Sequence, residues 1–304
     1  MGVGVKDGAR PEPLNSTMHS SRNLRLLRAS FTMADSKPKR LALWTCARSL
    51  STAMVMSFGN YGNVEVFNEM YTGACAFGPD RKMGVELPFP VEESLTFENV
   101  KSQMEADYPN KDLVFIKDHA AGMFGHYDQL PDGFTHAFII RNPEKTIASG
   151  VKLAAKTNFS PEEYLQTYKI FANFDGYAFG DLVALADHIE KVLGQHLVIL
   201  DADDLQRDPE KMLRLFCKAV GLPFRESLLK WEPIEEIPWH NSQSLLTIHK
   251  ANGAYEAALK STGWITGEPK SADLSQLPQI VLDAIEEARP FYQTLYEKRL
   301  MPDD

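Results

Sequence analysis

The sequence predicts a three-layer α/β fold, in which a mostly parallel sheet of about five strands is covered by helices. Strand-like apolar runs alternate along the chain with stretches that have the spacing of amphipathic helices. These runs are Arg40–Thr45, Asn63–Phe67, Asp112–Lys117, Thr135–Ile140 and His196–Leu200. The alternation indicates parallel strands, because each crossover between them needs a connection of helix length. A chain of 304 residues, 44% of them hydrophobic, is long enough to bury one sizeable core.

The first strand is followed by a short, hydroxyl-rich loop, residues 46–50, and by a helix that we expect to begin near Ser51. The first N–H groups of a helix are unpaired and partly positive, so an anion can bind there. Ser49 and Thr52 can cap or donate, and Arg48 adds a full positive charge. The Walker A pattern G-x-x-x-x-G-K-[ST] is absent. Taken alone, the segment is better explained as a plain Ser/Thr-capped helix.

The fourth strand, Thr135–Ile140, ends at an arginine. An Asn-Pro turn follows Arg141, a helix is expected from about Glu144, and Ser149 lies eight residues after the arginine. A guanidinium can bind a phosphate through two parallel hydrogen bonds, to which a nearby hydroxyl adds a third. Open α/β sheets bind ligands at the carboxyl ends of their strands. The alternative is an arginine paired with a surface carboxylate.

The fifth strand and the C-terminal stretch complete the predicted elements. The fifth strand ends at Asp201, and Asp208 with the following proline opens an amphipathic helix that Gly221 ends. Residues 277–300 have helical spacing, which Pro290 interrupts.

Charge and cysteine usage narrow the function classes. The formal net charge is −9, although residues 1–40 hold eight basic and only three acidic residues. An acidic domain argues against general nucleic-acid binding. The three cysteines and eight histidines show no metal-ligand spacing, so we expect no metal site and a reducing compartment. No apolar run reaches membrane-spanning length, and we expect a cytoplasmic protein.

The chain divides into an N-terminal extension, residues 1–38, and an α/β domain, residues 39–304. The extension is rich in Ser, Arg, Gly and Pro and is predicted to be flexible. Its segment Ser20–Phe31 is basic and faintly amphipathic, as in a mitochondrial presequence, but Asp7 and Glu12 count against such a role.

Three segments together resemble sulfotransferases that use 3′-phosphoadenosine 5′-phosphosulfate. Residues 47–52, A-R-S-L-S-T, are similar to the family's P-K-S-G-T-T or P-R-S-G-S-T loop. Residues 141–149, R-N-P-E-K-T-I-A-S, keep the family's eight-residue offset between Arg and Ser. Residues 200–224 resemble its third block, which ends in G-L-P-F. The segments occur in family order over roughly residues 40 to 225, and together they imply the sulfotransferase fold with a P-loop-like strand–loop–helix.

The resemblance implies which residues bind the phosphosulfate donor. The loop and first helical turn would hold the 5′-phosphosulfate, Arg141 and Ser149 would hold the 3′-phosphate, and Lys260 in a late K-S-T-G-W segment would close over it. The loop residues are Arg48, Ser49, Leu50, Ser51, Thr52 and Ala53. Ala47 and Leu50 depart from the family's Pro and Gly, so Leu50 should hold a different turn or bind the donor less closely. For Lys260 the alternative is an exposed surface lysine.

The resemblance also implies two candidates for the catalytic base. Residues 116–119, I-K-D-H, are similar to a family segment in which His is the base and Lys stabilises transferred charge, which indicates His119 and Lys117. Glu69 follows the second strand, in a segment that resembles the one in carbohydrate sulfotransferases whose glutamate is the catalytic base. An imidazole titrates near neutral pH, so His119 is the first choice. For each of these side chains the alternative is a purely structural role. Glu69 could also orient an amine on the acceptor instead of acting as the base.

The expected function is transfer of a sulfonate to a hydroxyl or amine of a small-molecule acceptor, without a metal ion. Two alternatives stay open. A P-loop-like small-molecule kinase is disfavoured by the missing Walker lysine and by the Arg141–Ser149 pair, and an inactive nucleotide-binding relative is suggested by Ala47 and Leu50. The sequence indicates neither the acceptor nor the oligomeric state.

Overall fold

The computed structural model describes residue 1, residues 37–81 and residues 89–302. Its five strands form one parallel sheet in the order β2-β3-β1-β4-β5, as the α/β fold class predicted. The strands are β1 (Lys39–Thr45), β2 (Val64–Asn68), β3 (Leu113–His119), β4 (Thr135–Ile140) and β5 (Val198–Asp201). Each predicted strand is confirmed with ends that agree within two residues.

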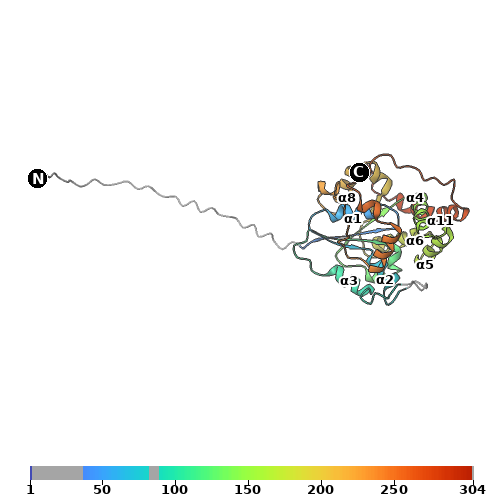
Figure 1. Ribbon diagram of the computed structural model, residues 1–304, viewed down its shortest axis with the longest axis horizontal. Coiled ribbons are helices and arrows are strands. Elements are labelled where there is room, and N and C mark those ends of the chain that lie inside the picture. The colour runs from blue at the N-terminus through green and yellow to red at the C-terminus, as the bar shows by residue number, and fades with distance from the viewer. Residues whose placement is uncertain (2–36, 82–88, 303–304) are drawn as a thin grey trace. The chain divides into compact units, whose positions relative to one another are not determined.

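Helices cover both faces of the sheet (Figure 1). The α-helices are α1 (Ser51–Gly59), α2 (Met70–Phe77), α3 (Phe97–Glu105), α4 (Pro143–Ala154), α5 (Pro161–Phe171), α6 (Phe179–Lys191), α7 (Ala202–Arg207), α8 (Pro209–Ala219), α9 (Gln243–Asn252), α10 (Glu256–Leu259) and α11 (Gln279–Tyr296). Short 3₁₀ turns are η1 (Ala120–Met123), η2 (Tyr127–Gln129), η3 (Ala155–Thr157) and η4 (Glu226–Leu228).

Side chains alternate between two cores, one on each face of the sheet. In β1, Leu41 and Leu43 pack with α1 and α8, whereas Ala42 and Trp44 pack with α2, α3, α6 and α11. In β4, Ile139 and its neighbour Phe138 divide between the two cores in the same way. This two-residue period explains why the central strands are continuously apolar, since both faces of a parallel sheet are buried.

The register brings the carboxyl ends of the strands to one edge. Thr45 at the end of β1 lies beside His119 at the end of β3, and Asn68 at the end of β2 lies beside Lys117. Segments that leave these strands therefore start close together, as expected for a ligand site in an open α/β sheet.

Two sequence expectations need correction. Helix α11 runs through Pro290, which was expected to interrupt it. Its buried side chains, Ala284, Ile285 and Ala288 among them, pack into the core and outweigh the missing proline N–H. A short helix, α7, also separates β5 from α8; Asp201 caps it by accepting hydrogen bonds from the N–H groups of Asp203 and Asp204.

The N-terminal extension predicted for residues 1–38 falls, from residue 2 to residue 36, outside the described residues. Lys37–Asp304 form one compact unit. Among the described residues, no helix is long and apolar enough to cross a membrane.

Candidate functional site

The loop between β1 and α1 has an unusual backbone conformation. Arg48 and Leu50 both have left-handed backbones, with φ of 66° and 65°. Leu50 thus adopts, with a side chain, the left-handed conformation that favours glycine. No side chain caps the start of α1 at Leu50, so the first N–H groups of the helix are free of a side-chain acceptor.

Ser49 faces the interior of this loop. Its hydroxyl is fully buried, hydrogen-bonds to the hydroxyl of Thr45 and donates to the Cys46 carbonyl at 2.8 Å. The Ser49 side chain thus fixes the loop from within, and Ser49 is not among the residues that line the cavity beside the loop.

Arg48, Arg141 and Ser149 meet beside the loop. The Arg48 Nε donates to Ser149 Oγ at 3.2 Å, and Arg141 donates to the Arg48 carbonyl at 3.0 Å. The second motif is therefore in contact with the first. The Arg141 Nε is buried without a hydrogen-bond partner among the described residues, 4.0 Å from the Asp203 carboxylate. A buried donor without a partner is an unfilled position for an acceptor.

These residues enclose a cavity of about 300 Å³, which we call the loop pocket. It is lined by Arg48, Leu50, Ser51, Thr52, Ala53, Arg141, Gln206, Ala254, Ala257, Ala258, Ser261, Gly263, Trp264 and Ile265. Five of the six predicted loop residues and Arg141 thus share one pocket, and Ser149 reaches its edge through Arg48.

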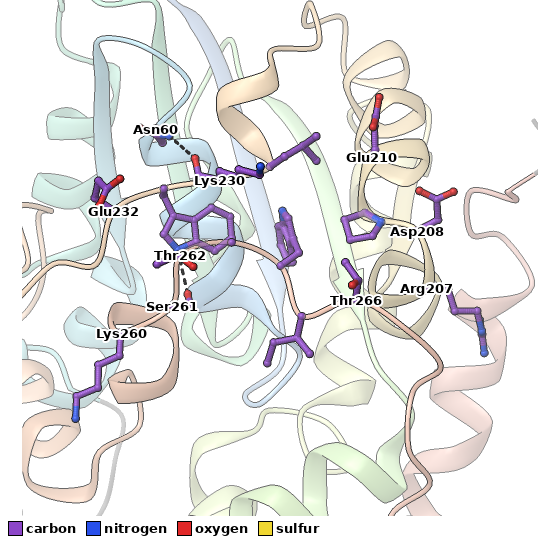
Figure 2. A pocket seen from close by; sticks show the side chains of 16 residues that line it. Asn60, Arg207, Asp208, Glu210, Lys230, Glu232, Lys260, Ser261, Thr262 and Thr266 are labelled. Atoms are coloured by element: carbon purple, nitrogen blue, oxygen red, sulfur yellow. Dashed lines mark hydrogen bonds between the residues drawn. The ribbon is translucent and has the colours of Figure 1, made fainter.

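The late K-S-T-G-W segment lies at the loop pocket, but its lysine points elsewhere. Ser261, Gly263 and Trp264 line the pocket. Lys260 is exposed, pairs with Glu256 at 2.6 Å and lines the neighbouring groove shown in Figure 2 rather than the loop pocket. That groove, of about 1110 Å³, lies on the other side of the same segment, where Trp231 meets Trp264 edge to face.

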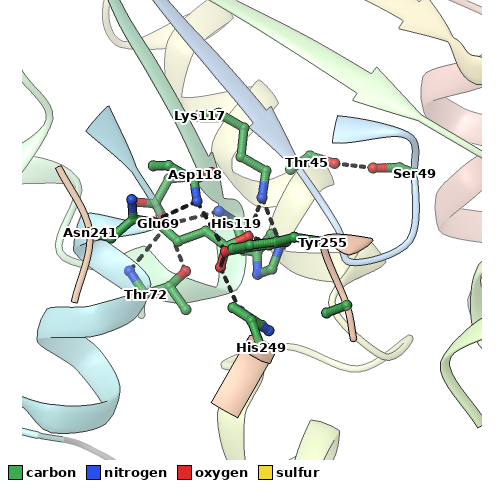
Figure 3. Close-up of polar contacts among 12 residues, drawn as sticks. Thr45, Ser49, Glu69, Thr72, Lys117, Asp118, His119, Asn241, His249 and Tyr255 are labelled. Atoms are coloured by element: carbon green, nitrogen blue, oxygen red, sulfur yellow. Dashed lines mark hydrogen bonds and ion pairs between the residues drawn. The ribbon is translucent and has the colours of Figure 1, made fainter. Parts of the chain in front are cut away.

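The second group of polar side chains surrounds Glu69, which begins α2 with a left-handed backbone (φ 58°). Lys117 donates to its Oε1, and His119 Nε2 lies 3.5 Å from the same oxygen. His249 Nε2 lies 3.0 Å from Oε2, and the Tyr255 hydroxyl donates to Oε2 at 2.7 Å. Figure 3 shows these four side chains converging on the carboxylate, and we call the five residues the Glu69 cluster.

Charge in the Glu69 cluster is set by burial and close contacts. Burial alone would raise the pKa of Glu69, but the Lys117 ammonium and the two histidines hold it well below its ordinary value. Burial, followed by the charge of Lys117, lowers the pKa of His119 to about 3. At neutral pH the cluster therefore contains an ionised carboxylate and a neutral His119 imidazole.

Asp118 anchors the backbone beneath the cluster. Its buried carboxylate accepts from the N–H groups of Tyr71, Thr72 and His119 and from the Thr72 hydroxyl. Burial raises the pKa of Asp118 to about 6, against the opposing effect of these hydrogen bonds. The carboxylate ties the end of β3 to the start of α2 and so fixes Glu69 relative to His119.

All three predicted catalytic candidates, Glu69, Lys117 and His119, lie together. Sequence reasoning missed His249 and Tyr255, which come from α9 and the turn after it, in a region without a recognisable motif. Among the described residues, no group of three or more His, Cys, Asp or Glu side chains could hold a metal ion.

Comparison with known proteins identifies the family of the chain. A family model described as a sulfotransferase domain matches residues 39–299. Two Arabidopsis thaliana proteins, named branched-chain-amino-acid aminotransferase-like proteins 2 and 1, are each 27% identical over 270 residues, which cover 83% and 85% of this chain. The same residues cover 40% and 42% of the two relatives, so the chain spans about two fifths of their length.

Solved structures give low similarity over most of the chain. The sulfotransferase domain of the Synechococcus PCC 7002 olefin synthase is 17% identical, with a TM-score of 0.44 over 84% of this chain and 95% of that one. A mouse sulfotransferase complexed with PAP is 12% identical, with a TM-score of 0.44 over 86% of this chain and 90% of that one. At these TM-scores the likeness carries no functional inference.

Proposed function

The chain belongs to the sulfotransferase domain family, and we propose that it transfers a sulfonate group from 3′-phosphoadenosine 5′-phosphosulfate to a hydroxyl or amine of a small-molecule acceptor. The observation that carries the proposal is the meeting of Arg48, Arg141 and Ser149 at the loop pocket. Two guanidinium groups and a hydroxyl beside an uncapped helix start suit a ligand with more than one phosphate.

The donor would bind with its two ends on different groups. Backbone N–H groups at the start of α1, together with Ser51 and Thr52, would hold the 5′-phosphosulfate. Arg141 and Ser149 would hold the 3′-phosphate, and the unpartnered Nε of Arg141 supports this assignment. Lys260 would have to leave Glu256 to reach the donor, so we assign closure of the pocket to the backbone around Gly263 instead.

In the transfer step, an acceptor oxygen or nitrogen attacks the sulfur in line with the departing phosphate oxygen. By analogy with phosphoryl transfer, catalysis consists mainly of positioning the two groups and stabilising the negative charge that grows on the leaving oxygen. Lys117 would supply positive charge, and a base would remove the acceptor proton. The products are the sulfonated acceptor, adenosine 3′,5′-bisphosphate and the released proton.

We assign the base to His119 rather than to Glu69. Both Glu69 oxygens are engaged by other side chains and the carboxylate is buried, whereas His119 is neutral and 16% exposed. A bound phosphosulfate brings negative charge near the imidazole, which would raise its basicity toward the working pH.

Incubation with sulfur-labelled phosphosulfate and a panel of small alcohols, phenols and amines tests the proposal. We expect label to move to at least one acceptor class and adenosine 3′,5′-bisphosphate to form in equal amount. The matched control is Arg141→Ala at the same protein concentration. Phosphoryl transfer from ATP and magnesium, without sulfonate transfer, would instead support the kinase alternative.

A further inference from the structure

The buried carboxylate of Glu69 has a complete set of partners. Oε1 pairs with Lys117, which is 1% exposed, while Oε2 is shared by His249 and Tyr255. Tyr255 is itself held, since its hydroxyl accepts from Asn68 Nδ2 at 3.0 Å. The two groups on Oε2 come from α9 and the turn after it, whereas Lys117 comes from the centre of the sheet.

A buried ion pair stays ionised only if hydrogen bonds replace the water that each charge has lost. Lys117 satisfies one oxygen of Glu69, and an unfilled Oε2 would favour protonation of the carboxylate. His249 and Tyr255 supply the two missing donors. Because the carboxylate is an anion, His249 must donate through Nε2, and its buried Nδ1 has no hydrogen-bond partner among the described residues.

His119 depends on the same pair. Its Nε2 lies 3.5 Å from the Lys117 ammonium and 3.5 Å from Glu69 Oε1. Asp118 on β3 is the remaining charged group close to the cluster, and it is bonded to backbone and to Thr72. A shift of Glu69 away from Lys117 would therefore change both the position and the protonation of His119.

We propose that His249 and Tyr255 are positioning residues of the transfer reaction, which act by holding the Glu69 carboxylate against Lys117 and beside His119. The inference rests on the proposed function, since it assigns roles within the same site. Neither residue touches the reacting atoms in this assignment.

The segment that carries His249 and Tyr255 also contacts the loop between β1 and α1. Ala254, immediately before Tyr255, accepts a hydrogen bond from Arg48 at 3.0 Å. The turn after α9 therefore joins the loop pocket to the Glu69 cluster. The backbone of this turn therefore contacts Arg48, which would bind the donor, and carries Tyr255, which would align Glu69.

Four variants of the full chain test the roles. His249→Ala and Tyr255→Phe each remove one donor to Oε2, and His249→Gln keeps an amide N–H near the place of Nε2. His240→Gln is the matched control, because His240 also bonds a carboxylate, Glu65 at 2.6 Å, outside the cluster. Each variant is assayed with labelled phosphosulfate, both with an acceptor found in the panel and with water as the acceptor, from about pH 5 to pH 8.

We expect His249→Ala to lower turnover at least about tenfold, with little change in affinity for adenosine 3′,5′-bisphosphate. Its rate should also begin to fall at a higher pH on acidification than in the wild type, because an unsupported Glu69 takes up a proton more readily. Tyr255→Phe should shift the profile in the same direction. His249→Gln should restore most of the rate, and His240→Gln should match the wild type.

The outcomes separate the inference from the proposed function. If the wild type turns over, and His249→Ala and Tyr255→Phe keep its rate and pH profile, the positioning roles are overturned. The proposed function then stands. Equal losses in His249→Ala and His249→Gln, without a pH shift, also overturn them and indicate a packing role. A wild type that consumes no phosphosulfate overturns the proposed function and the positioning roles with it.

Discussion

The loop pocket and the Glu69 cluster differ in how completely their charged groups are paired. At the loop pocket the Arg141 Nε has no hydrogen-bond partner among the described residues, and Leu50 gives α1 no side-chain cap. In the Glu69 cluster both carboxylate oxygens are bonded and the lysine is buried. Under the proposed function the pocket would receive an anion, whereas the charged groups of the cluster are already paired without a ligand.

The two regions also differ in how they are encoded. The sequence predicted part of the loop pocket from two short segments, residues 48–53 and Arg141 with Ser149, whereas the rest of its lining comes from Gln206 and from residues 254–265. The Glu69 cluster draws on four separate places: the end of β2, the end of β3, α9 and the turn that follows it. Because the cluster joins separate segments of the fold, removing one of its side chains should lower the free energy of unfolding. Removing a side chain of the loop pocket should instead weaken ligand binding.

The largest effect is expected for Lys117→Met. The variant leaves Glu69 buried without its counter-ion, so we expect the free energy of unfolding to fall by about 3–5 kcal/mol. The double variant Lys117→Met with Glu69→Leu should recover most of that loss. Lys191→Met, which breaks the exposed pair with Asp187, should change stability by less than about 1 kcal/mol. Urea unfolding measures all three, and a small loss for Lys117→Met would contradict a saturated, buried cluster.

For Arg141→Ala we expect a loss of ligand affinity rather than a loss of stability. Losing a charge-assisted hydrogen bond to phosphate should weaken binding of adenosine 3′,5′-bisphosphate by about 1.5–3 kcal/mol, as calorimetry would measure. Arg225→Ala is the control, because Arg225 pairs with Asp112 just before β3, at the amino-terminal edge of the sheet. Equal affinity in Arg141→Ala and the wild type would exclude Arg141 as the 3′-phosphate ligand.

His119→Ala should lower turnover at least about tenfold and leave nucleotide affinity nearly unchanged. The neutral imidazole is the active form, and its pKa of about 3 lies below the assay range. At low substrate concentration, where the wild-type rate reports the enzyme without bound donor, it should therefore not fall through protonation of His119 between about pH 8 and pH 5. Near-normal turnover of the variant would move the base to Glu69, and a midpoint near 6.5 that disappears in the variant would show an unshifted histidine.

The smallest effect concerns Leu50, whose backbone is left-handed. Leu50→Gly and Leu50→Ala both remove the side chain, but only glycine tolerates this conformation without strain. We expect the glycine variant to be more stable than the alanine variant by about 1 kcal/mol in urea unfolding. Equal stability would mean that the loop relaxes to another conformation.

The sequence predicted the sheet and the loop pocket because their signals are local. Thr135–Ile140 has the same bounds in the sequence and in the structure, and Arg141 and Ser149 follow it at fixed offsets. A buried parallel strand is a continuous apolar run, and such a run can be recognised without knowledge of its neighbours.

The rest depends on contacts between distant segments. His249 and Tyr255 reach Glu69 across about 180 residues, and nothing in their own neighbourhood indicates it. The helix through Pro290 is stabilised by packing that local propensity does not contain.

Calorimetric binding of adenosine 3′,5′-bisphosphate to the wild-type chain, compared with AMP and with ATP plus magnesium, tests the central claim most directly. The account predicts micromolar binding of the bisphosphate and a marked loss when the 3′-phosphate is absent. Equal binding of AMP, or a preference for ATP, would contradict a phosphosulfate site at Arg48, Arg141 and Ser149.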